Sequence, residues 1–121
     1  MDKLLFVALG SAIGGVARYL VGRFLPLQSD FPWPTFLVNV AGCFLIGLIY
    51  GLIDRGVGMS ESARLFLTVG FCGGFTTFST FVHENYVLFG SGNILVVAAY
   101  AALSFFVGII LAYAGHALAR L

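Results

Sequence analysis

The feature that most constrains the fold is a run of twelve residues at positions 70–81, with the sequence GFCGGFTTFSTF. It lies inside a long apolar segment, yet it contains three glycines and four hydroxyl side chains. Glycine lets a backbone bend or approach another chain closely. Serine and threonine hydroxyls can bond the carbonyls that are freed where a helix breaks. The run therefore predicts a helix that is interrupted at membrane depth, with a binding or transport site at the interruption.

The composition indicates an integral membrane protein. Of the 121 residues, 60% are hydrophobic and only 9% are charged, whereas roughly a quarter of the residues of a soluble domain are charged. The formal net charge of +1 provides no basic footprint for nucleic acid, so we expect no nucleic-acid partner. The two cysteines, Cys43 and Cys72, lie in apolar runs and are expected to be small packing residues.

Four apolar segments are each long enough to cross a bilayer as a helix, which takes about twenty residues. They cover about 4–25, 33–53, 63–88 and 94–118, and we assign residues 1–121 to a single all-α, four-span membrane domain. Prolines at 26, 32 and 34 mark the first connection. Four spans place both termini on one side of the membrane, and the surrounding bilayer lipid is an expected partner.

The basic residues give only a weak preference for one orientation in the membrane. The side of the termini holds four and the other side holds two: Lys3, Arg55, Arg64 and Arg120 against Arg18 and Arg23. Such a small difference permits insertion either way up. Four helices make a poor pore wall on their own, so a dimer of identical subunits is the natural way to enclose a pathway.

Two polar side chains inside the spans each allow two interpretations. Arg18 costs about 2.5–3.5 kcal/mol on insertion scales if it lies deep in the bilayer. It either extends to the interface together with Arg23, or faces a water-filled vestibule and attracts anions. Asn39 either makes an interhelical hydrogen bond that serves packing, or points its amide N–H groups into a pore.

The other polar groups of the spans favour an anion over a cation. No span interior contains a buried carboxylate of the kind that drives proton-coupled transport. We find no catalytic triad, metal-ligand cluster or phosphate loop, so an enzyme is not expected. Hydrogen-bond donors are abundant instead, and with Arg18 they form an anion-compatible set: Asn39, Thr76, Thr77, Ser79, Thr80 and Tyr100.

The run at 70–81 offers two further sites. Phe78 and Phe81 share a helix face, and the positive edges of their rings could contact a small dehydrated anion; the alternative is an ordinary apolar stripe that packs or faces lipid. Carbonyls freed at Gly73 and Thr76 would need a partner, and a cation is one candidate.

The run at 70–81 resembles the signature of the Fluc (CrcB) fluoride channels. Residues 14–19 (GGVARY), residues 35–42 (TFLVNVAG) and the four-span size agree, so the resemblance covers nearly the whole chain. It implies a passive fluoride-selective channel in the cell inner membrane or plasma membrane, which exports fluoride down its electrochemical gradient. It also implies an antiparallel, dual-topology homodimer with two pores.

The resemblance assigns roles to individual residues. It implies that the fluoride pore is lined by Asn39, Phe78, Phe81, Ser79, Thr80 and Tyr100. It places Arg18 near the vestibule and Glu84 near the end of the pore. It implies that the backbone carbonyls of Gly73 and Thr76, two from each subunit, hold a central structural sodium ion.

Two other classes of function compete with a channel. A small multidrug-type antiporter is also a four-span, dual-topology protein, but it needs a membrane-embedded carboxylate in the first span, and the interior of residues 4–25 has none. A non-transporting membrane scaffold would use the glycines only for helix packing. The fluoride sensitivity of cells that lack the protein separates these classes, because a scaffold predicts no such sensitivity.

Overall fold

The computed structural model describes residues 2–25 and 29–121, and within these ranges all the regular structure is helical. Pro26 of the predicted first connection lies outside them. The helices are α1 (Asp2–Phe24), α2 (Trp33–Asp54), α3 (Glu61–Leu65), the π-helix η1 (Phe66–Cys72), α4 (Gly73–Phe75), α5 (Phe78–Gly90) and α6 (Ile94–Ala119). In the described part of the chain, four helical segments are long and apolar enough to cross a membrane: Asp2–Phe24, Trp33–Asp54, Glu61–Gly90 and Ile94–Ala119. The predicted all-α class with four candidate spans is confirmed.

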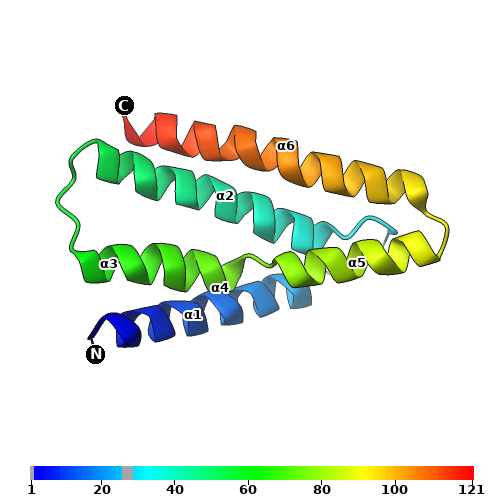
Figure 1. Ribbon diagram of the computed structural model, residues 1–121, viewed down its shortest axis with the longest axis horizontal. Coiled ribbons are helices and arrows are strands. Elements are labelled where there is room, and N and C mark those ends of the chain that lie inside the picture. The colour runs from blue at the N-terminus through cyan, green and yellow to red at the C-terminus, as the bar shows by residue number, and fades with distance from the viewer. Residues whose placement is uncertain (1, 26–28) are drawn as a thin grey trace.

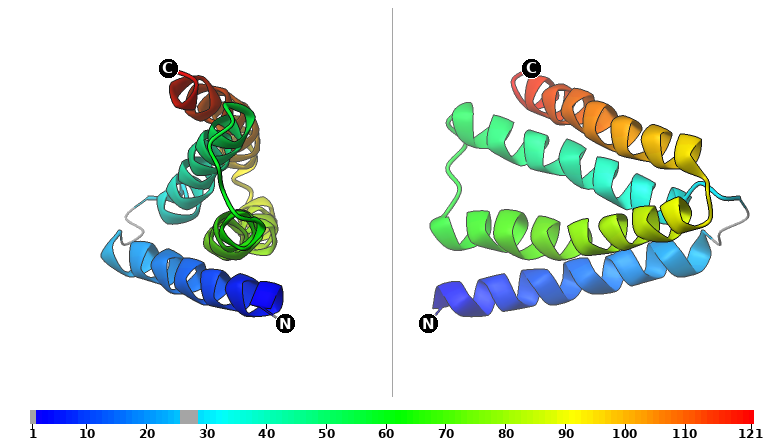
Figure 2. Two further views of the ribbon diagram at one scale, coloured as in Figure 1. Left: turned by 90° about the vertical axis from the view of Figure 1, so that its left-hand side faces the viewer. Right: turned by 45° about the vertical axis from the view of Figure 1, so that its right-hand side comes forward.

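The chain runs back and forth, so that both termini lie at one end of the bundle (Figure 1). The link between α2 and α3 lies at that same end, and the turn between α5 and α6 lies at the other. The helices pack mainly as two pairs, α1 against the third span and α2 against α6 (Figure 2). α5 also contacts α6 beyond the break described below.

Glycines let the helices of each pair approach backbone to backbone. A Cβ atom added at Gly14 of α1 would collide with the carbonyl of Phe71, and one at Gly10 with the carbonyl of Phe66. In the other pair, a Cβ at Gly47 of α2 would collide with the carbonyl of Ala112. This close approach through small residues is the common way to pack helices in lipid, where no hydrophobic force draws them together.

The third span is interrupted at two threonines. Thr76 (φ −88°, ψ 160°) and Thr77 (φ −150°, ψ 124°) are extended, while the helix before them ends at Phe75 and α5 begins at Phe78. The glycines of the run remain helical: Gly73 has φ −63° and ψ −36°. The hydroxyl residues therefore form the break, and the depth of this break in the bilayer remains a prediction.

The two cysteines lie inside the bundle as thiols. Cys72 is buried and Cys43 is half-buried beside Gly108, and within the described ranges neither forms a disulfide. Their positions agree with the predicted packing role. Large apolar side chains elsewhere are exposed, for example Leu95 and Phe105, as expected of surfaces that face lipid or another subunit.

Candidate functional site

Asn39 holds the break from the neighbouring helix. Its Nδ2 donates to the Thr77 carbonyl at 3.1 Å, and its Oδ1 accepts from the Thr77 N–H at 2.8 Å. These two bonds replace hydrogen bonds that the interrupted helix has lost. The predicted interhelical hydrogen bond of Asn39 is therefore present, and its partner is the backbone of the break. The amide keeps a second Nδ2 hydrogen, and Asn39 also lines a pocket described below.

Thr77 also begins the second half of the span. Its Oγ1 accepts a hydrogen bond from the Thr80 N–H at 3.3 Å, which makes Thr77 the N-cap of α5. The first N–H groups of a helix, here those of Phe78 and Ser79, have no intrahelical acceptor. They also carry the positive end of the helix dipole. The start of α5 is thus a cluster of donors suited to an anion.

The first half of the span ends at Phe75, and Arg18 lies beside this end. The Nε of Arg18, which is half-buried, donates to the Gly74 carbonyl at 3.1 Å. In a continuous helix this carbonyl would accept from Phe78 instead. The Thr76 hydroxyl donates to the Cys72 carbonyl at 2.8 Å, a local bond of the kind that bends helices.

The carbonyls of Gly73 and Thr76 both lose their helical donors. The N–H of Thr77 would bond the Gly73 carbonyl in a continuous helix, but it donates to Asn39. The N–H of Thr80 would bond the Thr76 carbonyl, but it donates to the Thr77 hydroxyl. Gly73 is exposed on the surface of the subunit. These two oxygens are thus available to a hard cation, which prefers carbonyl ligands.

Glu84 is bound by two hydroxyls on other helices. Thr35 Oγ1 donates to Glu84 Oε2 at 2.9 Å, and the Tyr100 hydroxyl donates to Glu84 Oε1 at 2.8 Å. Tyr100 is fully buried. The sequence singled out Glu84 and Tyr100 separately and did not predict their contact. It also missed Thr35, which lies one helical turn before Asn39 on the same face of α2; this spacing was the available signal.

The two predicted pore phenylalanines lie together at the start of α5. The ring centroids of Phe78 and Phe81 are 6.0 Å apart, with an angle of 35° between the rings. Phe81 also meets Tyr100 edge to face at 4.8 Å, whereas Phe78 is 77% exposed. Ser79 is exposed on the same helix, so the Phe78 side chain and the Ser79 hydroxyl are both free to meet a second subunit or lipid.

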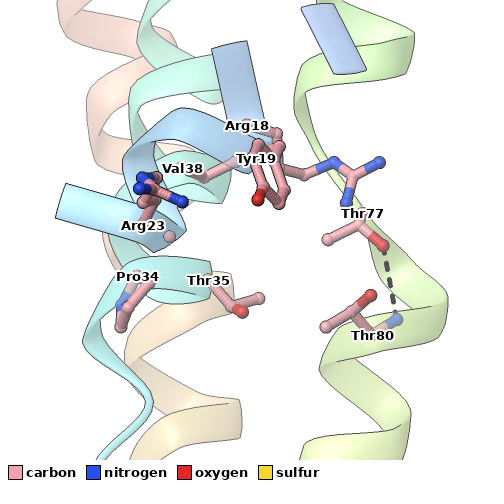
Figure 3. Close-up of a pocket in the computed structure, with 9 residues that line it drawn as sticks. Arg18, Tyr19, Arg23, Pro34, Thr35, Val38, Thr77 and Thr80 are labelled. Carbon is pink, nitrogen blue, oxygen red and sulfur yellow. Dashed lines mark hydrogen bonds between the residues drawn. The ribbon is translucent and has the colours of Figure 1, made fainter. Parts of the chain in front are cut away.

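Two pockets flank the break. The smaller, of about 380 Å³, is lined by Arg18, Tyr19, Gly22, Arg23, Pro34, Thr35, Val38, Thr77 and Thr80 (Figure 3). Its side chains include two arginines and three threonines but no carboxylate. The Arg18 guanidinium lies close to Thr77 in this view. The positive charge of the two arginines and the threonine hydroxyls make the smaller pocket suited to an anion.

The larger pocket, of about 600 Å³, is mostly apolar. It contains Asn39, Phe78 and Phe81, and Thr77 lines both pockets. Ser104, which no sequence pattern singled out as a site residue, also lines this pocket. Its buried hydroxyl has no hydrogen-bond partner in the part of the chain that the structure describes. The predicted site residues are thus divided. Asn39, Phe78, Phe81, Gly73 and Thr76 line the larger pocket, Arg18 and Thr80 line the smaller one, and Ser79, Glu84 and Tyr100 line neither.

Apolar helices of spanning length, with a broken third segment and half-buried donors around the break, define a multi-pass membrane protein with a polar site between its spans. The comparison with known proteins is more specific. Residues 5–116 match the family described as "CrcB-like protein, Camphor Resistance (CrcB)". The chain belongs to this family.

Curated relatives match over nearly their whole length. A protein of Flavobacterium psychrophilum named "Fluoride-specific ion channel FluC" is 39% identical, over 99% of this chain and 98% of the relative. A protein of the same name from Thermus thermophilus is 44% identical, over 98% of this chain and 95% of its own length. A third, from Ignicoccus hospitalis, is 40% identical, over 99% and 97% of the two chains.

Proposed function

We propose that this protein is a fluoride-selective passive ion channel, which exports fluoride from the cytoplasm across the cell inner membrane or plasma membrane. One observation carries the proposal: full-length relatives at 39–44% identity are named fluoride-specific ion channels. The geometry of the break agrees with an anion pathway, because donors outnumber carboxylates there.

Fluoride is small and holds its water tightly, so a pore must replace that water with many weak donors rather than one strong site. The chain supplies such donors on both sides of Thr77. The smaller pocket offers the hydroxyls of Thr77 and Thr80 beside Arg18. The larger pocket offers the Asn39 amide and the ring edges of Phe78 and Phe81, whose partial positive charge attracts an anion.

A passive mechanism is supported by the positions and hydrogen bonds of the carboxylates. The only acidic residue of α1 is Asp2, in its first turn, so a small multidrug-type antiporter would lack its coupling group. Glu84 lies deeper, but its carboxylate accepts bonds from Thr35 and Tyr100. Both carboxylate oxygens of Glu84 are thus engaged in hydrogen bonds within the subunit.

The proposal includes an antiparallel homodimer with two pores and one structural sodium ion between the subunits. The weak difference in basic residues between the two membrane sides supports insertion in both orientations. The residues fit a sodium ion, because the Gly73 and Thr76 carbonyls have lost their helical donors. When bound, the ion would add positive charge near the pathway; the protein's own groups still perform the stepwise replacement of water.

Fluoride efflux from liposomes that contain the purified protein tests the function. We expect efflux from the wild-type protein in sodium-containing buffer. We expect Phe78→Ile to lower the efflux without preventing dimerisation, whereas Phe89→Ile, at an exposed position on the same helix, leaves it unchanged. No efflux from a folded dimeric wild-type protein, with sodium present, would refute the proposed function.

A further inference from the structure

Arg18 makes a contact that neither an interfacial nor a vestibule role explains. Its Nε donates to the carbonyl of Gly74, a residue 56 positions away in the sequence. An arginine that only extends to the interface would have its guanidinium in water, and one that only attracts ions would have all its N–H groups directed at the pocket. Instead, one N–H is committed to the backbone at the break.

The packing of α1 places Arg18 at this carbonyl. Gly14 lies one helical turn before Arg18, on the same face, and a Cβ there would collide with the Phe71 carbonyl. A Cβ at Gly74 would in turn press on the carbonyl of Ser11. The two backbones are therefore in direct contact along this face, and the contact fixes where the Arg18 side chain reaches the third span.

The electrostatics of the break explain why a cation is useful here. The half-helix that ends at Phe75 presents free carbonyls and the negative end of a helix dipole, while α5 presents the positive end. Left bare, the negative end would repel an anion that approaches the donors of Thr77 and Thr80. The Arg18 guanidinium lies on that negative end and offsets it.

We propose that Arg18 is a positioning residue: it caps the first half of the broken span at the Gly74 carbonyl and thereby holds the Thr77 backbone in register with Asn39. Arg18 also lines the smaller pocket. A guanidinium can do both because it has five N–H groups in a fixed fork, whereas a lysine ammonium has a single centre. The consequence for ion flow rests on the proposed channel function; the cap itself does not.

Three variants of the full-length protein separate a cap from a simple charge. Arg18→Gln removes the charge and shortens the side chain, and Arg18→Lys keeps the charge but gathers its N–H donors at one centre. Arg23→Gln is the matched control, because Arg23 lines the same pocket and is exposed. Two readouts are needed: hydrogen–deuterium exchange of the amides of Thr77 and Thr80, which are bonded in the native state, and fluoride efflux from liposomes.

We expect Arg18→Gln and Arg18→Lys to accelerate exchange of the two amides by about tenfold, as for the loss of one charge-assisted hydrogen bond, and to lower efflux. Arg23→Gln should leave exchange unchanged. Unchanged exchange in both Arg18 variants would overturn the proposal, as would wild-type behaviour of Arg18→Lys in both readouts. If Arg18→Gln does not fold, the Arg18→Lys comparison decides. A wild-type protein without efflux would refute the channel function, and the exchange measurement would still test the cap.

Discussion

At the scale of single residues, the site consists of side chains that form hydrogen bonds with the backbone groups of an interrupted helix. Asn39 bonds both backbone groups of Thr77, and Arg18 bonds the Gly74 carbonyl. The sequence singled out both residues because each is polar inside an apolar span. It could not assign their partners, because a contact between residues far apart in the chain depends on which helix faces meet, and one sequence contains no direct record of that.

We predict that Asn39→Ala destabilises the protein by about 1–3 kcal/mol, since it removes two interhelical bonds and leaves the Thr77 backbone groups unpaired. Thermal unfolding in detergent measures the change. Asn93→Ala is the matched control, because among the described residues the Asn93 side chain makes no cap bond to α6. Equal stability of the two variants would show that the bonds to Thr77 contribute nothing.

The Glu84 contact leads to a second residue-scale prediction. Tyr100→Phe should lower stability by about 1–2 kcal/mol, because it leaves a carboxylate oxygen without its donor. Tyr113→Phe removes the same hydroxyl from a side chain that is 76% exposed and should leave the unfolding midpoint unchanged. A Tyr100→Phe protein as stable as wild type would contradict the contact.

At the scale of elements, the spans were largely predictable and the break was predictable only in part. Hydropathy and length are enough to find apolar helices, because the bilayer leaves the backbone few alternatives. The run at 70–81 correctly indicated an interruption. The sequence did not show that Thr76 and Thr77 form it while the glycines stay helical, because glycine serves both backbone bending and helix packing. Only the position of α1 shows that Gly70 and Gly74 serve helix packing rather than backbone bending.

The packing role of the glycines yields an element-scale prediction. Gly14→Ala should weaken the contact of α1 with η1 and lower the unfolding midpoint, because its Cβ would collide with the Phe71 carbonyl, a backbone atom that cannot move independently. Gly15→Ala is the neighbouring control, since a Cβ built there would meet no atom of another described helix within 4 Å. If both variants have the unfolding midpoint of the wild type, the close packing of α1 against η1 is wrong.

At the scale of the whole molecule, one subunit leaves the proposed pathway open on one side. Phe78 is 77% exposed and Gly73 is exposed, although both lie at the break. A second copy of the chain that covers Phe78 and Gly73 would enclose the proposed pathway on this side. The exposure of these two residues supports the proposed dimer, whose antiparallel arrangement comes from the family resemblance and the weak charge difference.

Dual topology is testable by changing that charge difference. We predict that a reporter fused to the C-terminus appears on both sides of the membrane for the wild-type chain. Added lysines at the C-terminus should bias the chain towards one orientation, and the loss of oppositely inserted partners should reduce both dimers and fluoride efflux. A reporter found on one side only, in a chain that conducts fluoride, would exclude the antiparallel arrangement.

The central claim, that a broken span lined by donors conducts fluoride passively, is tested most directly by current through a voltage-clamped bilayer containing the purified protein. With a fluoride gradient and chloride as the control anion, we predict a current that reverses at the fluoride equilibrium potential and no measurable chloride current. A reversal potential that shifts with pH at constant fluoride, or a chloride current of similar size, would contradict the account.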